Sequence, residues 1–191
     1  CDFTPPRSGD PEIVAQAQLD VDFISVSYNP GRAVRTNSAM LAAAIQRSGK
    51  DTVFTLATRD MNKLAVQTQL LGAQMLGVEN VVVVQGDPFS ERDRSMVASV
   101  NDYQPTGLIA AISKMNQGQD FRDGKLRAAT IFCIGAVVDL SKGIEEEARL
   151  AVRKVRAGAQ FLITQPIFDM DQVARYRQFY ADYAGEARVP P

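Results

Sequence analysis

The chain has 191 residues, of which 46% are hydrophobic and 23% charged, with 21 basic residues against 22 acidic ones. This balance is typical of a folded globular protein; the interleaved charges argue against nucleic acid as a partner, and no apolar run approaches the roughly 20 residues that a membrane span needs. Histidine is absent, which excludes the usual general base of serine and cysteine hydrolases and most zinc sites, and two cysteines are too few for a disulfide framework, so we expect a cytoplasmic protein.

Short β-branched runs alternate with longer amphipathic stretches along the chain. The runs predict buried strands at residues 23–27, 52–57, 81–84, 130–136 and 161–164, and residues 1–3 would be the end of a first strand. The stretches between and after them predict helices at residues 11–19, 38–47, 62–76, 107–115, 144–157 and 171–183. The helix over 144–157 has the clearest pattern, because glutamates fill its first turn, basic residues its last, and Gly158 follows as a C-terminal cap.

A strand followed by a helix, repeated at a spacing of about 30 residues, predicts an α/β fold of the (β/α)₈ TIM barrel type, with about six of its eight units present. A full barrel takes roughly 250 residues. We therefore expect residues 1–191 to be a single barrel domain that is truncated before the seventh strand, which would begin at 189–191. An open doubly wound sheet is the structural alternative.

Polar residues follow most of the predicted strands, at the edge where both kinds of α/β enzyme place their sites. Asp87 comes soon after four valines and before Pro88, and it either acts at the site or only turns the chain. Asp2, in the first strand, would face the same opening, unless it is simply solvated. The stretch of about 18 residues before Gly107 is long for a plain connection and is typical of a lid or binding loop.

These strand-end motifs, in this order, resemble the methylenetetrahydrofolate reductase family from Asp2 to about Tyr180. The motifs that carry the resemblance are Asp2-Phe3-Thr4-Pro5-Pro6-Arg7, Ser25-Val26-Ser27-Tyr28, Arg35-Thr36-Asn37-Ser38, Thr58-Arg59-Asp60-Met61-Asn62, Gly86-Asp87-Pro88, Phe132-Cys133-Ile134-Gly135-Ala136, Lys154-Val155-Arg156-Ala157-Gly158-Ala159 and Ile163-Thr164-Gln165-Pro166-Ile167-Phe168-Asp169. Each motif is weak alone, and the series in register is specific.

The resemblance implies a barrel that holds FAD, takes a hydride from NADH or NADPH and reduces 5,10-methylenetetrahydrofolate to 5-methyltetrahydrofolate, a one-carbon step that serves methionine biosynthesis. It implies that Asp2 is the general acid that opens the imidazolidine ring, that Asp87 lies by the flavin and the pterin, and that Gln165 hydrogen-bonds the pterin. The flavin contacts that it implies are Ser27, Thr55, Gly86, Asp87, Tyr103, Ala136, Glu147, Arg153 and Lys154. We expect a homo-oligomer, and leave open a partner subunit that supplies electrons.

The sequence departs from the family pattern at the acid and at several flavin contacts. Asp2 stands where the family generally has glutamate, which shortens its reach by about 1.5 Å. Thr55 replaces a frequent histidine, Gln85 a frequent arginine, and Val137-Val138-Asp139-Leu140 a Pro-Glu-Xaa-His segment. Two alternatives follow from these changes: a folate-binding accessory subunit without independent catalysis, and an NADH-dependent reductase that uses no flavin.

Overall fold

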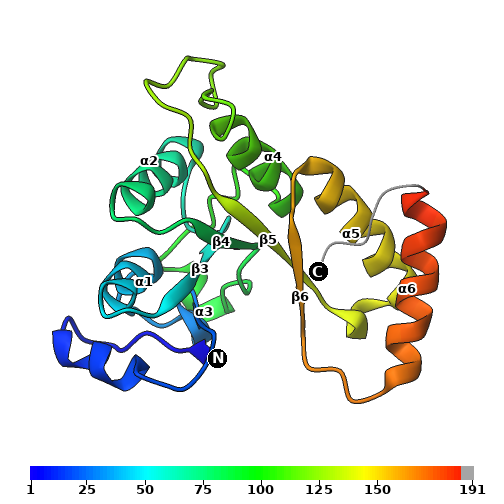
Figure 1. The fold of residues 1–191 in the computed structure, drawn as a ribbon, viewed down its shortest axis with the longest axis horizontal. Helices are drawn as coiled ribbons and strands as arrows, with labels where there is room; N and C mark the ends of the chain where they lie inside the picture. The colour runs from blue at the N-terminus through cyan, green and yellow to red at the C-terminus, as the bar shows by residue number, and fades with distance from the viewer. Residues whose placement is uncertain (186–191) are drawn as a thin grey trace.

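A computed structural model describes residues 1–185, so the expected start of a seventh strand at 189–191 lies outside the described residues. A single sheet of six parallel strands runs in chain order, each strand hydrogen-bonded to the next (Figure 1). The strands are β1 (Asp2–Phe3), β2 (Phe23–Val26), β3 (Asp51–Ala57), β4 (Asn80–Val84), β5 (Cys133–Val138) and β6 (Phe161–Thr164). The curled sheet is part of a (β/α)₈ barrel. The doubly wound alternative is wrong, because such a sheet reverses its strand order at a switch point.

The helices follow the strands that the sequence predicts for them. They are α1 (Ser38–Arg47), α2 (Lys63–Met75), α4 (Pro105–Met115), α5 (Ile144–Ala157) and α6 (Met170–Ala184), with a short α3 (Glu91–Arg94) in the loop after β4. Asn37 and Asn62 cap α1 and α2, since each side chain accepts hydrogen bonds from backbone N–H groups of the first turn. The predicted end of α5 is confirmed, with Gly158 in the left-handed region at φ +122°.

Side chains alternate along each strand between two faces of the sheet, and this alternation decides which residues reach the site. Ile24, Phe54, Val81 and Ile134 belong to the core between the sheet and the helices. The residues between them face the inner side, where the interior of a barrel lies. Asp2 pairs with Ser25 on this inner side. At the β6 end of the sheet, α5 packs along α6 (Figure 1).

Two predicted elements differ from the structure. The segment predicted as a helix at 11–19 is a 3₁₀-helix, Pro11–Ala17, in which only Ala17 is buried, so it has too little apolar contact to stabilise a longer regular helix. The strand predicted at 130–136 begins instead at Cys133. Residues Thr130 and Phe132 stay outside the sheet because their N–H groups bond to Met115 and Asn116 at the end of α4.

No helix within residues 1–185 has both the length and the apolar character that crossing a membrane requires.

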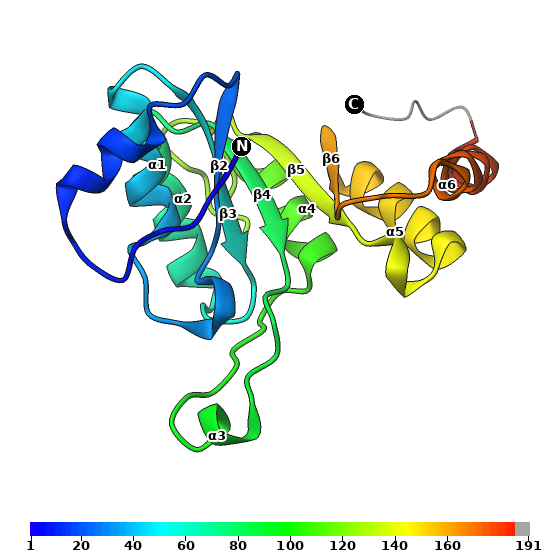
Figure 2. The ribbon, with the colours of Figure 1, turned by 90° about the horizontal axis from the view of Figure 1, so that it is seen from below.

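The long loop after β4 leaves the carboxyl edge of the sheet and carries α3 well away from it (Figure 2). Two further 3₁₀ turns, η2 (Pro30–Arg32) and η3 (Leu140–Lys142), lie in the loops after β2 and β5. The loops after β2, β4 and β5, which contain these short elements, therefore all begin at the carboxyl edge of the sheet.

Candidate active site

Asp2, in β1, and Ser27, directly after β2, lie side by side. The Ser27 hydroxyl donates to the Asp2 carboxylate, at 2.8 Å from Oδ1 and 3.0 Å from Oδ2. The contact follows from the register, because Asp2 and Ser25 are paired and Ser27, directly after β2, is the next residue on the same side. The carboxylate remains exposed on its other side. The structure thus brings together one predicted acid and one predicted flavin contact.

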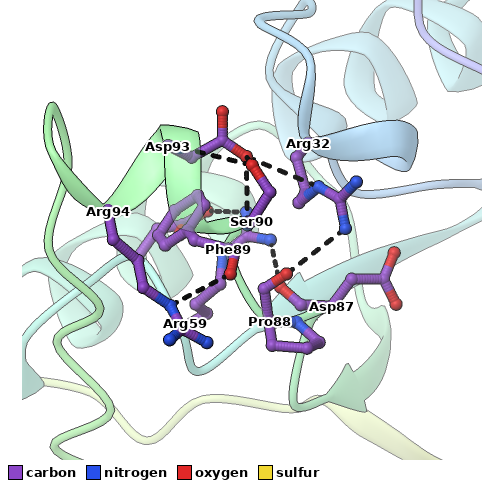
Figure 3. Close-up of polar contacts among 9 residues, drawn as sticks. Arg32, Arg59, Asp87, Pro88, Phe89, Ser90, Asp93 and Arg94 are labelled. Atoms are coloured by element: carbon purple, nitrogen blue, oxygen red, sulfur yellow. Dashed lines mark hydrogen bonds and ion pairs between the residues drawn. The ribbon is translucent and has the colours of Figure 1, made fainter.

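Asp87 lies at the start of the long loop, and its backbone is held from the neighbouring strand. Gly86 adopts φ +85°, and a Cβ there would lie 3.2 Å from the Arg59 Cβ and 3.3 Å from the Ala57 Cβ. Only glycine combines this left-handed conformation with so close an approach at low cost. The Arg59 guanidinium donates to the Asp87 carbonyl at 2.7 Å, while the Asp87 side chain is exposed (Figure 3).

The loop after β2 contributes a half-buried phenol, that of Tyr28, near Arg59 and Asp60. Burial raises the pKa of Tyr28 well above its usual value, and the negative charge of Asp60 and the hydrogen bond with it raise it further. The phenol therefore stays protonated at neutral pH and acts as a hydrogen-bond donor. Tyr28, Arg59 and Asp60 belong to the motifs that carry the resemblance, but the sequence pattern assigns them no role. The signal that could have found them is a charged pair, Arg59-Asp60, directly after a buried strand.

Gln165 lines an open groove of about 650 Å³ between the loops after β5 and β6. The other polar residues that line it are Asp139, Ser141, Asp169 and Gln172, and Phe168 is 97% exposed at its border. Asp139 and Asp169 accept hydrogen bonds from backbone N–H groups of their own turns. The groove offers acceptors and amides rather than cations, which suits a ligand edge rich in N–H groups.

The residues predicted on α5 gather behind the end of β5. Lys154 is 7% exposed, and its Nζ donates to the Val137 carbonyl at 2.6 Å. Glu147 is buried too and accepts from the Asp139 N–H at 3.1 Å. Burial lowers the pKa of Lys154, the nearby Glu147 opposes this, and the positive charges of Lys142 and Arg153 lower it further. Arg153 is exposed beside this cluster.

The remaining predicted flavin contacts are spread over both sides of the sheet. Thr55 is half-buried on the inner side and its carbonyl accepts from Ser38. Ala136 faces the helices, within the main core. Tyr103 lies against α2, where its hydroxyl accepts from Gln67 at 3.4 Å. The structure therefore does not bring the side chains of Tyr103 and Ala136 together with the inner-side group at Asp2, Ser27 and Thr55.

Within the described residues, no group of three or more Cys, Asp and Glu side chains is arranged to hold a metal ion.

A family model described as methylenetetrahydrofolate reductase matches residues 1–191, the whole chain. The chain belongs to the methylenetetrahydrofolate reductase family. The family that the strand-end motifs predicted is therefore confirmed.

Relatives of this reductase-family chain are distant. Methylenetetrahydrofolate reductase 2 of Schizosaccharomyces pombe is 22% identical over 166 residues, which make up 86% of this chain and 26% of the relative. A solved structure, an uncharacterized protein from Clostridium thermocellum that binds two copies of 5-methyl-5,6,7,8-tetrahydrofolic acid, superposes with a TM-score of 0.62 at 14% identity. That match covers 98% of this chain and 61% of the other, so the chain spans less than two thirds of each relative.

Proposed function

We propose that the protein containing this chain is a flavin-dependent reductase that converts 5,10-methylenetetrahydrofolate to 5-methyltetrahydrofolate with NADH or NADPH. The observation that carries the proposal is the placement of Asp2, Asp87 and Gln165 at one edge of a family barrel: Asp2 lies in β1, Asp87 in the loop after β4 and Gln165 directly after β6. Support for a folate ligand comes from the Clostridium thermocellum neighbour, which binds 5-methyltetrahydrofolate.

In this proposal Asp2 supplies the proton that opens the imidazolidine ring of the substrate. The Ser27 hydroxyl, which donates to both Asp2 oxygens, fixes the rotamer of the carboxylate. A positioned acid contributes about 10²–10⁴-fold to a rate. Gln165 both donates and accepts, as does the amide edge of a pterin, and the exposed Asp87 carboxylate accepts from its N–H groups. These three side chains orient the one-carbon unit for reduction.

The residues on α5 fit the phosphates of FAD. Burial lowers the pKa of Lys154, and the like charges of Lys142 and Arg153 lower it further, so an anion beside these side chains would relieve the repulsion. Arg153 is exposed and adjacent, and its planar guanidinium suits a phosphate. Ser27 and Thr55 would contact the flavin from the inner side. When bound, FAD supplies two-electron hydride chemistry, so an enzyme without histidine can still carry out a reduction.

An absorption spectrum of the full-length protein tests the proposal. We expect a flavin spectrum that bleaches under anaerobic NADH or NADPH and returns when methylenetetrahydrofolate is added. A colourless protein that binds folate but does not turn it over, even after FAD is added, would instead favour the accessory subunit. Turnover without any flavin would favour direct hydride transfer from the nicotinamide.

The role of Arg153 gives a second prediction. Arg153→Gln is expected to weaken FAD binding about 10- to 100-fold, because it removes a charge-assisted hydrogen bond worth about 1.5–3 kcal/mol. The melting temperature of the apoprotein should not change, since Arg153 is exposed. Arg156→Gln is the matched control: it is exposed on the same helix, but its guanidinium donates to the Tyr183 carbonyl on the α6 side. Equal loss of FAD affinity in both variants would contradict the assignment.

A further inference from the structure

Arg59 is a buried cation to which the proposed reaction assigns no role. The residue is 5% exposed, at the end of β3. Its Nε and one terminal nitrogen form a two-pronged contact with the Asp60 carboxylate, at 2.5 and 2.8 Å. Its other terminal nitrogen donates to the Asp87 carbonyl at 2.7 Å. The hydrogen bond with Asp60 raises the pKa of Arg59, so the side chain is charged at every relevant pH.

The face of the same guanidinium is covered by the loop that carries Asp87. The Arg59 Cζ lies 4.2 Å from the centre of the Phe89 ring (Figure 3). Arg59 thus binds the loop at two successive places, through the carbonyl of Asp87 and the ring of Phe89. A lysine could not do both, because it lacks the planar fork.

The backbone of the same segment holds both ends of the loop. The Thr58 N–H donates to the Val84 carbonyl at 3.1 Å where the chain leaves β4. The Val100 N–H donates to the Arg59 carbonyl at 2.7 Å where the chain returns. The more distant contacts of the loop are weaker: the Arg32 to Asp93 ion pair is 3.7 Å long and partly exposed. Arg59 is therefore the main fixed point from which Asp87 projects.

We propose that Arg59 is a positioning residue of the reductase site, which sets the place of the Asp87 carboxylate through the Asp87 carbonyl and the Phe89 ring without itself touching the substrate. This inference deepens the proposed function and rests on it. Three N–H groups of the guanidinium are engaged by protein oxygens and the group is buried, so it has no surface to offer a ligand. Its effect on the reaction runs through Asp87 alone.

Steady-state kinetics of the full-length protein test the inference. Arg59→Lys keeps the charge and loses the fork, and it is expected to lower kcat with methylenetetrahydrofolate about 10- to 100-fold, since a misplacement of about 1 Å costs on this order. NADH oxidation by an artificial acceptor should stay within about twofold in this variant. Arg94→Gln is the control, since it removes an exposed arginine that donates to the Phe89 carbonyl of the same loop at 3.2 Å. It should leave both rates unchanged.

A double-mutant cycle separates positioning from a structural role. In an Asp87→Asn background, Arg59→Lys should cause no further loss of kcat, because the carboxylate that it places is gone. Losses that multiply in the double variant would overturn the inference. Should Arg59→Lys not fold, Phe89→Leu loosens the same anchor, and we expect a loss of kcat of about threefold that likewise disappears with Asp87→Asn. Wild-type turnover with an unaffected Arg59→Lys overturns this inference alone, whereas wild-type protein without turnover overturns the proposed function as well.

Discussion

Replacement of Asp2 by asparagine in the full-length protein is expected to lower methylenetetrahydrofolate reduction by about 10²–10⁴-fold, the usual contribution of a positioned acid. The amide is isosteric with the carboxyl group and still accepts from Ser27, so the fold should be unchanged. NADH oxidation by an artificial acceptor should continue nearly as in the wild type, because that half-reaction needs no proton from this carboxyl group. The two rates are measured separately under anaerobic conditions.

Two further variants sharpen the assignment of Asp2. Asp2→Glu keeps the acid and restores the longer side chain that the family generally has, so it should retain folate reduction. Asp22→Asn, at another exposed aspartate, should change neither half-reaction. If Asp2→Asn abolished both half-reactions together, the carboxyl group would serve the site as a whole and not the folate step, and its role as the acid would be abandoned.

Gly135→Ala is expected to produce a large loss of stability, of about 1–3 kcal/mol, by overpacking the inner side of the sheet. Gly135 is paired with Phe161, and a Cβ at Gly135 would lie 2.3 Å from the Cζ of its ring. The ring would have to leave its place or the two strands would have to separate. For a chain of this size, thermal unfolding should begin several degrees lower, by about 2–4 °C for each kcal/mol.

A glycine elsewhere supplies the control. Gly72, within α2, has no heavy atom near the place that a Cβ would take, so Gly72→Ala should stabilise the protein by about 0.5–1 kcal/mol. Combining Gly135→Ala with Phe161→Leu should recover part of the loss by making room for the methyl group. An unchanged melting temperature in Gly135→Ala would mean that the Phe161 ring is not fixed over the strand.

The sheet could be predicted from sequence because its central strands are short β-branched runs. Residues 52–57, 81–84 and 161–164 all lie within β3, β4 and β6. The pattern failed at 130–132, which was predicted as part of a strand. Phe132 is buried, yet its N–H donates to the Asn116 side chain and not to a neighbouring strand. It failed again at 11–19, where only Ala17 is fully buried and Ile13 and Val14 are partly buried against the core, and this short apolar contact gives only a 3₁₀-helix.

The candidate site was predictable to the extent that topology alone decides it. Because parallel strands end at one edge, Asp2, Asp87 and Gln165 could be grouped before any contact was known. Strand alternation further separates Ala136, on the helix side, from Gly135, on the inner side. The role proposed for Arg59 could not be predicted from strand order. It depends on the path of the loop after β4, and the sequence of that loop has no periodic pattern.

Because the strands pair in chain order from β1 to β6, each of β2 to β6 pairs with the strand synthesised just before it. During synthesis the sheet can grow by one strand at a time, with no waiting for a distant segment. The connection from β4 to β5 is the exception, because it contains the α3 loop, α4 and the turn that follows before the next strand pairs. Loop closure costs more as the loop lengthens, so pairing β5 with β4, beside the loop that carries Asp87, has the largest closure cost in the described sheet.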